Sequence, residues 1–330
     1  MLEVLEAGVL TTIQDAGRPD WTHLGVPVGG ACDPWSLAVA NLLVGNDAGA
    51  AAVEMTLVGG TFIVRSPVTV GLAGADLGGV IRELDRRLAA GRTHRLEEGT
   101  TIAFPGAADP AGRSGARAYV ALPGGIDVPS VLGSSSTALG AEFGGIDGRQ
   151  LRAGDLLRAR EPEAVPGHEA AWPALDDDPL AATNLDPIRL LPGPAAGLAA
   201  ILGSEWMVGA ASDRVGLRLE GPRPLPASSS GELLSHGVVR GAIQLPPGGA
   251  PIVLMADHQT TGGYPIAAVV ITADHPRLGQ LGPGSKLRFE ATTIDDARLA
   301  LVRQREALAR GAATLRAGAT WDELWQSAGG

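Results

Sequence analysis

Short apolar or alternating runs that end at glycine or proline make up most of this chain. Residues 60–65, 68–72, 116–122 and 251–255 are examples. Alternation over such short lengths is typical of β-strands, and glycine and proline favour the tight turns between them. The pattern therefore predicts a mainly β protein.

A leucine followed by a glycine turn and a further short strand recurs along the chain. It is found at residues 96–102, 151–157 and 281–287. The second and third copies suggest one structural unit used once in each half of the chain. We therefore expect two β-rich halves.

The segment between these halves is rich in proline and aspartate. Five prolines and the aspartate run 176–178 fall within residues 161–187. This composition favours a linker or a long surface crossing. The predicted division is an N-terminal half (1–165), a linker (166–187), a C-terminal half (188–292) and a helical tail (293–330).

Few helices are expected before the tail. Asp33 is a favourable N-cap and Pro34 a favourable first helical residue, so a helix should run from there and stop at Gly45. Pro194 similarly predicts the start of a short helix that ends before Gly203.

After Phe289 the pattern of apolar and polar residues changes from that of strands to that of a helix. Residues 294–310 are rich in alanine, leucine and arginine, and Gly311 is a favourable helix end. Residues 320–323 form a capping box, which predicts a separate, last short helix. The expected fold is thus mainly β, with a few short helices and a helical C-terminal tail.

Composition narrows the classes of function. The net charge of −10 argues against nucleic acid and against an anionic membrane surface, since both require clustered basic residues. Cys32 is the only cysteine, so no disulfide within the chain is expected. The N-terminus lacks a basic region and an apolar run, so no signal peptide or membrane helix is expected. These features predict a cytoplasmic protein.

The chain has one lysine, Lys286, which restricts the available chemistry. A Schiff base, a phosphate-loop lysine or a biotinyl-lysine would each need this residue, and its neighbours match none of those contexts. The six histidines show no ligand spacing, so no metal site is expected. Residues 133–137 resemble a nucleophile elbow, but Thr137 stands where glycine is required, which favours a simple serine-rich turn.

Four segments combine polar side chains with glycines where the strand alternation breaks: residues 11–19, 212–222, 241–246 and 257–265. In the last, a predicted strand gives way to an acid, an imidazole, amides, hydroxyls and two glycines, which together could hold a small amide-like substrate. An ordinary polar hairpin is equally compatible with these residue types. Asp213 with Arg214, and Gln14 and Asp15 with Arg18, could instead pin turns as ion pairs, and Gln244 could face solvent.

The same segments carry a resemblance to a known family. The matching stretches, in family order, are residues 11–18, 24–31, 41–46, 74–76, 116–119, 124–126, 132–137, 212–222, 241–244 and 257–265. They are similar to the C-type subunit of 5-oxoprolinase, to allophanate hydrolase subunit 2 and to the biotin-dependent carboxyltransferase domain of urea carboxylase. The resemblance extends over roughly residues 1–292.

This resemblance implies two cyclophilin-like β-barrel domains and a function within a larger enzyme. The chain would be part of an ATP-dependent 5-oxoprolinase, which opens the lactam of 5-oxoproline to give glutamate. A smaller B-type subunit of related fold would bind it, commonly as a heterotetramer, and a lactam-hydrolysing A-type subunit would complete the enzyme. The chain alone would be inactive.

Roles for individual residues also follow from the resemblance. Arg18 and Arg214 would stabilise phosphate charge, and Asp15, Asp213 and Asp257 would orient these arginines or transfer protons. The substrate would be bound by residues of three segments: Gln14, Gln244, His258, Gln259, Thr260, Thr261, Gly262, Gly263 and Tyr264.

Departures from the family leave other functions open. His258 stands where the family often has arginine, and Cys32 and Val215 stand where methionine is common. One alternative is a biotin-dependent carboxyltransferase acting on urea or another amide, with biotin carried on another chain. Another is a non-enzymatic regulatory partner of a B-type subunit that resembles a kinase inhibitor.

Overall fold

The computed structural model describes the chain except residues 107–114, 162–168, 181–185, 223–233 and 329–330, together with the side chains of residues 319–328. Its mainly β class, its few short helices and its C-terminal helix agree with the sequence prediction. Within the described ranges, no helix is both long enough and apolar enough to cross a membrane.

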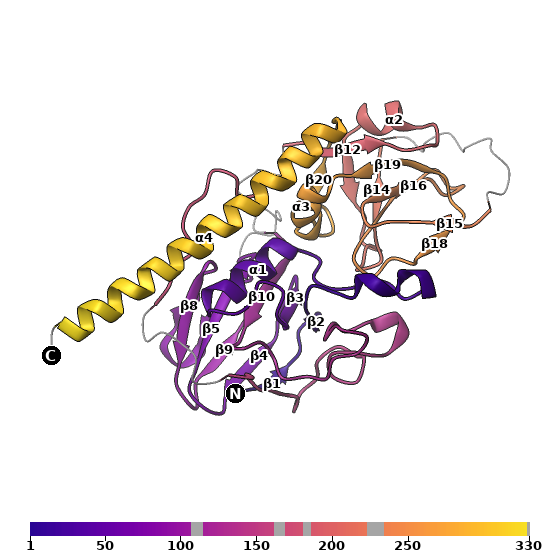
Figure 1. Ribbon diagram of the computed structural model, residues 1–330. Helices are drawn as coiled ribbons and strands as arrows, with labels where there is room; N and C mark the ends of the chain where they lie inside the picture. The colour runs from indigo at the N-terminus through magenta and orange to yellow at the C-terminus, as the bar shows by residue number, and fades with distance from the viewer. Residues whose placement is uncertain (107–114, 162–168, 181–185, 223–233, 329–330) are drawn as a thin grey trace.

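Two antiparallel sheets share one core in the first half of the chain (Figure 1). The core takes side chains from both sheets, such as Val4 and Phe62 from one and Val53 and Leu72 from the other. One sheet has the strand order β11-β1-β4-β9-β6-β7 and the second has the order β2-β3-β10-β5-β8. The strands are β1 (Leu2–Glu6), β2 (Leu10–Gln14), β3 (Ala52–Thr56), β4 (Thr61–Val64), β5 (Val68–Gly74), β6 (Val80–Ile81), β7 (Arg86–Arg87), β8 (Arg92–Leu96), β9 (Thr101–Ala103), β10 (Arg117–Ala121) and β11 (Leu156–Leu157).

An eight-stranded sheet forms the second half, in the order β20-β13-β14-β17-β16-β19-β12-β21. Its two outermost strands, β20 (Lys286–Leu287) and β21 (Phe289–Ala291), are separated by one residue, so the sheet curls into a nearly closed barrel. The inner strands are β12 (Ile188–Pro192), β13 (Trp206–Val208), β14 (Gly216–Glu220), β16 (Ala242–Gln244), β17 (Ile252–Leu254) and β19 (Ile266–Val270). A separate ribbon pairs β15 (His236–Gly237) with β18 (Thr261–Gly262).

The first helix, α1 (Pro34–Leu43), begins as the sequence predicts. The Asp33 carboxylate accepts a hydrogen bond from the Ser36 amide at 3.0 Å, which caps the helix. Gly45 has a φ of +79° and its amide donates to Leu42 O, which ends the helix where expected.

The second helix, α2 (Leu198–Leu202), begins four residues after the predicted start at Pro194. The backbone before it is bound elsewhere, because the Gly193 and Ala195 amides donate to Ala267 O and Ile266 O. Gly197 then takes a φ of +118°, which a helix does not allow. The remaining helical elements are α3 (His275–Gly279) and the short turns η1 (Pro19–Leu24), η2 (Arg82–Leu84), η3 (Leu139–Ala141) and η4 (Thr272–Asp274).

The tail forms one helix, α4 (Ile294–Ala328), so the predicted end at Gly311 and the separate last helix are wrong. A Cβ atom at Gly311 would lie 2.4 Å from the indole ring of Trp172. The glycine therefore allows close packing on Trp172 and does not terminate the helix. Figure 1 shows α4 passing the second half, running along α1 and extending beyond the first half.

Part of the predicted linker lies against the first half. The Thr93 amide donates to Ala170 O at 2.9 Å, and the Trp172 amide donates to Gly91 O at 2.8 Å. The Trp172 ring meets the Trp35 ring edge-on, with centroids 6.2 Å apart. Residues 162–168 and 181–185 of this segment lie outside the described residues, and the predicted domain limits stay a prediction.

Candidate functional site

Arg214 lies at the junction of the two halves and is 3% exposed. Its Nε and Nη2 donate to the two carboxylate oxygens of Asp257 at 2.8 and 2.9 Å. Nη2 also donates to Gly30 O at 2.7 Å, and Nη1 donates to the Glu54 carboxylate. Every nitrogen of this guanidinium is thus engaged within the protein.

Glu54, on β3, is the partner of Arg214 from the first half and is 1% exposed. Its Oε2 accepts hydrogen bonds from Tyr119 Oη at 2.6 Å and from the Cys32 amide at 2.8 Å. Burial acts to raise the pKa of Glu54, but Arg214 and Arg117 outweigh it and the net shift is downward. The carboxylate is therefore ionised at neutral pH.

The sequence reasoning missed Glu54, Tyr119 and Arg117. A signal was present, since Glu54 is a charged residue between the apolar residues Val53 and Met55 on β3. Tyr119 is its cross-strand neighbour on β10, which is itself buried at all five positions. A charge in a strand buried on both faces needs partners, so it marks a buried network.

A pair of glycines joins the N-terminal segment to the junction. Gly29 and Gly30 have φ values of +65° and +81°, which favour glycine. The Gly29 amide donates to Ala256 O at 3.2 Å, and the Ala31 amide donates to Asp15 O at 3.0 Å. This turn therefore places the predicted residues near position 15 beside those near position 257.

Asp15 organises the serine-rich turn that follows β10. Its carboxylate accepts from the Gly17 amide at 2.8 Å, Ser134 Oγ at 2.6 Å and the Ser135 amide at 2.5 Å, and also from Ser136 Oγ. This one carboxylate thus contacts three consecutive serines of the turn.

Arg18 is buried and keeps one donor without a partner. Its Nη2 donates to Ser136 O at 2.6 Å, and its guanidinium lies 4.9 Å from the centre of the Phe143 ring. Nη1 has no hydrogen-bond partner among the described residues, and it points to Gly29, whose Cβ position would lie 3.3 Å away. Burial lowers the pKa of Arg18, and the nearby charges of Asp15 and Asp257 act in the opposite direction.

Two glutamine amides in the predicted set are also incompletely paired. Gln14 Nε2 donates to Thr12 Oγ1 and Thr137 O, but Gln14 Oε1 has no partner in the described part of the chain. Gln244 Oε1 accepts from Gln259 Nε2 at 3.4 Å, and Gln244 Nε2 has none there. Buried polar atoms of this kind are costly unless water or a ligand satisfies them.

The segment 257–265 divides into two parts. Asp257 and His258 turn inward, and His258 Nδ1 lies 2.6 Å from Gln259 O. Burial, with a smaller contribution from Arg240, lowers the pKa of His258. The later residues form a hairpin, with Thr261–Gly262 paired to β15 and Tyr264 44% exposed.

The remaining predicted residues lie at the edge of the junction around Arg214 or apart from it. Gln259, Thr261 and Gly263 are exposed, and Thr260 O accepts the Val238 amide at 3.0 Å. Asp213 Oδ1 accepts the Val215 and Gly216 amides at 2.8 and 3.1 Å, which pins its own turn. The chemical roles assigned to all these residues stay predictions.

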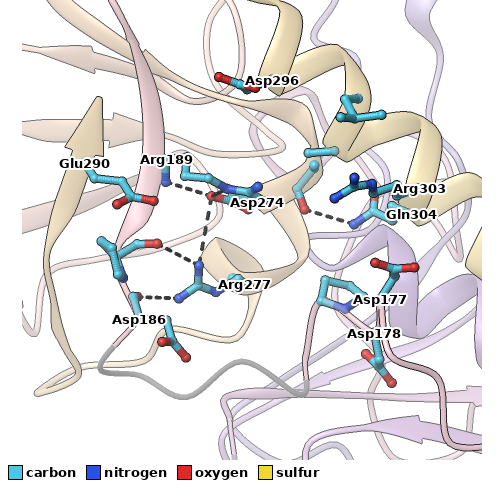
Figure 2. A pocket seen from close by; sticks show the side chains of 15 residues that line it. Asp177, Asp178, Asp186, Arg189, Asp274, Arg277, Glu290, Asp296, Arg303 and Gln304 are labelled. Atoms are coloured by element: carbon cyan, nitrogen blue, oxygen red, sulfur yellow. Dashed lines mark hydrogen bonds and ion pairs between the residues drawn. The ribbon is translucent and has the colours of Figure 1, made fainter. Parts of the chain in front are cut away.

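A cavity of about 530 Å³ lies between α4 and the second half, and no predicted site residue lines it (Figure 2). Among its charged side chains, Arg189 Nη2 donates to Asp274 Oδ1 at 2.6 Å, and Arg277 Nη1 donates to the backbone carbonyl of Pro187 at 2.9 Å. Gln304 of α4 donates to Ala273 O at 2.9 Å. This last hydrogen bond joins α4 to the second half. In the part of the chain that the structure describes, no group of three acidic, histidine or cysteine side chains suits a metal ion.

Comparisons with known proteins show which proteins this chain resembles. The family model described as "Carboxyltransferase domain, subdomain A and B" matches residues 24–291. The chain is 37% identical to the C-type subunit of 5-oxoprolinase from Escherichia coli, over 90% of this chain and 93% of that protein. It is 33% identical to the C-type subunit of 5-oxoprolinase from Haemophilus influenzae, over 90% of this chain and 93% of that protein. The solved structure of Kluyveromyces lactis urea amidolyase is 27% identical with a TM-score of 0.82, over 93% of this chain and 20% of that one.

Proposed function

We propose that this chain, which belongs to the family of the carboxyltransferase domain, subdomain A and B, is the C-type subunit of an ATP-dependent 5-oxoprolinase. One observation carries the proposal: the chain matches the two bacterial subunits over nearly its own full length and nearly the full length of each subunit. It corresponds to only a fifth of the urea amidolyase structure, whose remaining length would have to be supplied by other chains.

The reaction requires activation of a stable ring amide. Transfer of the γ-phosphoryl group of ATP to the lactam oxygen would release ADP and make the ring carbon electrophilic. A first water would then open the C–N bond and leave an acyl phosphate, which a second water hydrolyses to glutamate and phosphate. In this scheme the protein must stabilise the charge on the transferred group and orient the amide.

Among the two predicted phosphate-binding arginines, Arg18 is the better candidate for direct contact. Its Nη1 has no partner among the described residues, whereas all three nitrogens of Arg214 are engaged. We assign Arg214 to positioning Asp257, which faces Arg18 across Gly29. The unpaired amide atoms of Gln14 and Gln244 suit hydrogen bonds to a polar ligand or to water.

The carboxyltransferase alternative depends on biotin from another chain. Lys286, the only lysine, is exposed on strand β20 and pairs with Glu205 at 3.0 Å. Neither its surroundings nor the residues beside it favour a biotinyl-lysine. We therefore keep transfer to urea, and a purely regulatory role, as alternative outcomes of the activity assay.

Partner subunits and location are part of the same proposal. We expect the chain to work in the cytoplasm with a B-type subunit of related fold, in a heterotetramer, and with a lactam-hydrolysing A-type subunit. The chain alone should show no turnover, because the two bacterial relatives are themselves named as subunits.

The test is ATP hydrolysis by the reconstituted three-subunit complex in the presence of 5-oxoproline, urea or allophanate. We expect turnover with 5-oxoproline only. Arg18→Met should lower kcat by about 100- to 1,000-fold, the usual effect of removing one donor to a developing negative charge. Arg65→Met, which removes an exposed arginine paired with Glu3, serves as the control and should leave kcat unchanged.

Folding of the Arg18 variant is checked by its Tm and its binding to the B-type subunit. Full activity in a folded Arg18→Met complex would remove Arg18 from the mechanism. Turnover only with urea and a biotin-carrying chain would favour the carboxyltransferase alternative. Tight binding to the B-type subunit with no turnover of any substrate would favour the regulatory role.

A further inference from the structure

A second, smaller cavity of about 200 Å³ lies in the first half beside the Asp15 carboxylate. Glycines and alanines form most of its wall, at residues 49–51, 124–125 and 133, together with Ile126. The side chains that bring polar groups to it are Asp15, Ser130, Ser135 and Arg160. The cavity thus has one acid, one base and two hydroxyls against an otherwise small, uncharged lining.

Asp15 lines this cavity and retains an acceptor position. Its Oδ1 accepts from the Gly17 amide, Ser134 Oγ and Ser136 Oγ, whereas its Oδ2 accepts only from the Ser135 amide. A carboxylate oxygen can accept about two hydrogen bonds. Oδ2 is therefore the oxygen that can receive an N–H from a bound molecule.

Ser135 contributes a second group to the same cavity. The residue is 6% exposed, and its hydroxyl has no hydrogen-bond partner in the described part of the chain. Its backbone amide is fixed on Asp15 and its carbonyl accepts the Gly145 amide at 2.9 Å. The hydroxyl is therefore held at a defined place and can donate to a carbonyl oxygen.

Arg160 supplies the positive charge. Its side chain is 47% exposed, with Nη2 donating to Val128 O at 3.0 Å and Nε 3.7 Å from the exposed Asp127 carboxylate. This exposed ion pair is weak in water, and Nη1 has no partner among the residues that the structure describes. The guanidinium can therefore receive a carboxylate at the cavity.

The volume limits the ligand. At about 30 Å³ for each water in the liquid, 200 Å³ corresponds to roughly seven waters, or a molecule of amino-acid size. Pockets for drug-sized ligands start at about 300 Å³, so the cavity itself suits a smaller molecule.

We propose that this cavity binds the lactam acid, with the ring N–H on Asp15 Oδ2, the lactam oxygen on Ser135 Oγ and the carboxylate on Arg160. The identity of the ligand as 5-oxoproline rests on the proposed function. The chemistry also suits catalysis: phosphorylation of the lactam oxygen places positive charge on the ring N–H, and Asp15 can take up that proton as the O–P bond forms and the bond to ADP breaks.

The experiment compares Arg160→Met with the wild-type chain in the full three-subunit complex. We expect the KM for 5-oxoproline to rise about 10- to 100-fold, because a charge-assisted contact to the substrate carboxylate is lost. The KM for ATP should stay unchanged. With 2-pyrrolidinone, which lacks the carboxylate, the variant and the wild type should show the same kcat/KM.

Arg158→Met is the matched control, since Arg158 is exposed two residues earlier and does not line the cavity. An unchanged KM for 5-oxoproline in Arg160→Met, in a complex that is active, overturns the cavity proposal and leaves the proposed function standing.

Binding to the isolated chain separates the two proposals. Calorimetric titration with 5-oxoproline should show binding that Arg160→Met abolishes and Arg158→Met retains. This binding pattern, together with a three-subunit complex that shows no 5-oxoproline-dependent ATP hydrolysis, would support the cavity proposal and overturn the proposed function. Equal binding of 5-oxoproline by Arg160→Met and Arg158→Met would overturn the cavity proposal.

Discussion

Buried charge is concentrated in a few residues where the two halves meet. Glu54, Arg117 and Arg214 are each almost fully buried, and Asp257 closes the group from the second half. Removing such ions from water costs several kcal/mol each, so the group is stable only because each charge has an opposite partner and further hydrogen bonds. Loss of one member should therefore be far more harmful than loss of a surface pair.

Glu54→Gln tests this at the residue scale. The substitution leaves Arg214 and Arg117 without their shared carboxylate, so we expect a loss of about 3 to 5 kcal/mol in the free energy of unfolding. Urea unfolding, monitored by intrinsic tryptophan fluorescence, measures this free energy of unfolding.

The matched control is Glu3→Gln, which breaks the partly exposed pair with Arg65. It should cost at most about 1 kcal/mol. Equal urea midpoints for the two variants would show that the buried group contributes no more than a surface pair.

At the scale of elements, the C-terminal helix shows how one glycine can mislead sequence reasoning. Gly311 has the residue type that often ends a helix, but its position faces the Trp172 ring. Gly318 lies later in the same helix, and a Cβ atom there would meet nothing within 4 Å. The two glycines thus share secondary structure and differ only in their tertiary neighbours.

Alanine substitutions at these two positions should have opposite effects. Alanine favours a helix interior by about 1 kcal/mol over glycine, so Gly318→Ala should keep or raise the Tm. Gly311→Ala should lower the Tm, because the new methyl group overlaps the Trp172 ring and must push α4 or the 170–172 segment away.

Differential scanning fluorimetry gives both values, and Trp172→Leu in the Gly311→Ala background should recover part of the loss. A higher Tm for Gly311→Ala alone would mean that the glycine is not needed for this contact.

At the scale of the whole molecule, the halves are held by contacts in addition to the Arg214 group. Arg240 of the second half donates to Ala31 O at 3.0 Å and to Cys32 O. Gln280 Nε2 donates to Asp33 at 2.6 Å and to Arg117 O at 2.9 Å. The relative placement of the halves, and hence of the Arg18 and Asp257 side chains, depends on this polar interface.

His275, close to this interface, should make stability depend on pH. Burial, then the charge of Arg240, lowers its pKa from 6.5 to about 3. Below about pH 6.5 the unfolded chain binds a proton that the folded protein does not accept until about pH 3. Stability is therefore full above pH 6.5 and falls progressively towards pH 3, by roughly 4 to 5 kcal/mol from this residue.

His275→Gln removes the titrating ring and should flatten the decline of Tm between pH 6.5 and 4. His23→Gln, at an exposed position, is the control and should follow the wild-type curve. An unchanged slope in His275→Gln would assign the acid sensitivity to other groups.

The sequence by itself determined the local structure. Short alternating runs gave the β class, and Asp33 with Pro34 gave the start of α1, because strand periodicity and capping depend on residues close together in the chain. Ordered motifs also identified the family and the segments around Gln14, Arg214 and Asp257.

Only the tertiary structure decided how these segments combine. Glu54 and Arg214 are 160 residues apart in sequence, and nothing local predicts their contact. The same holds for Gly311, whose role depends on Trp172, and for the hydrogen-bond donor that Arg18 retains. Burial and long-range partners set these features, and both arise only when distant parts of the chain pack together.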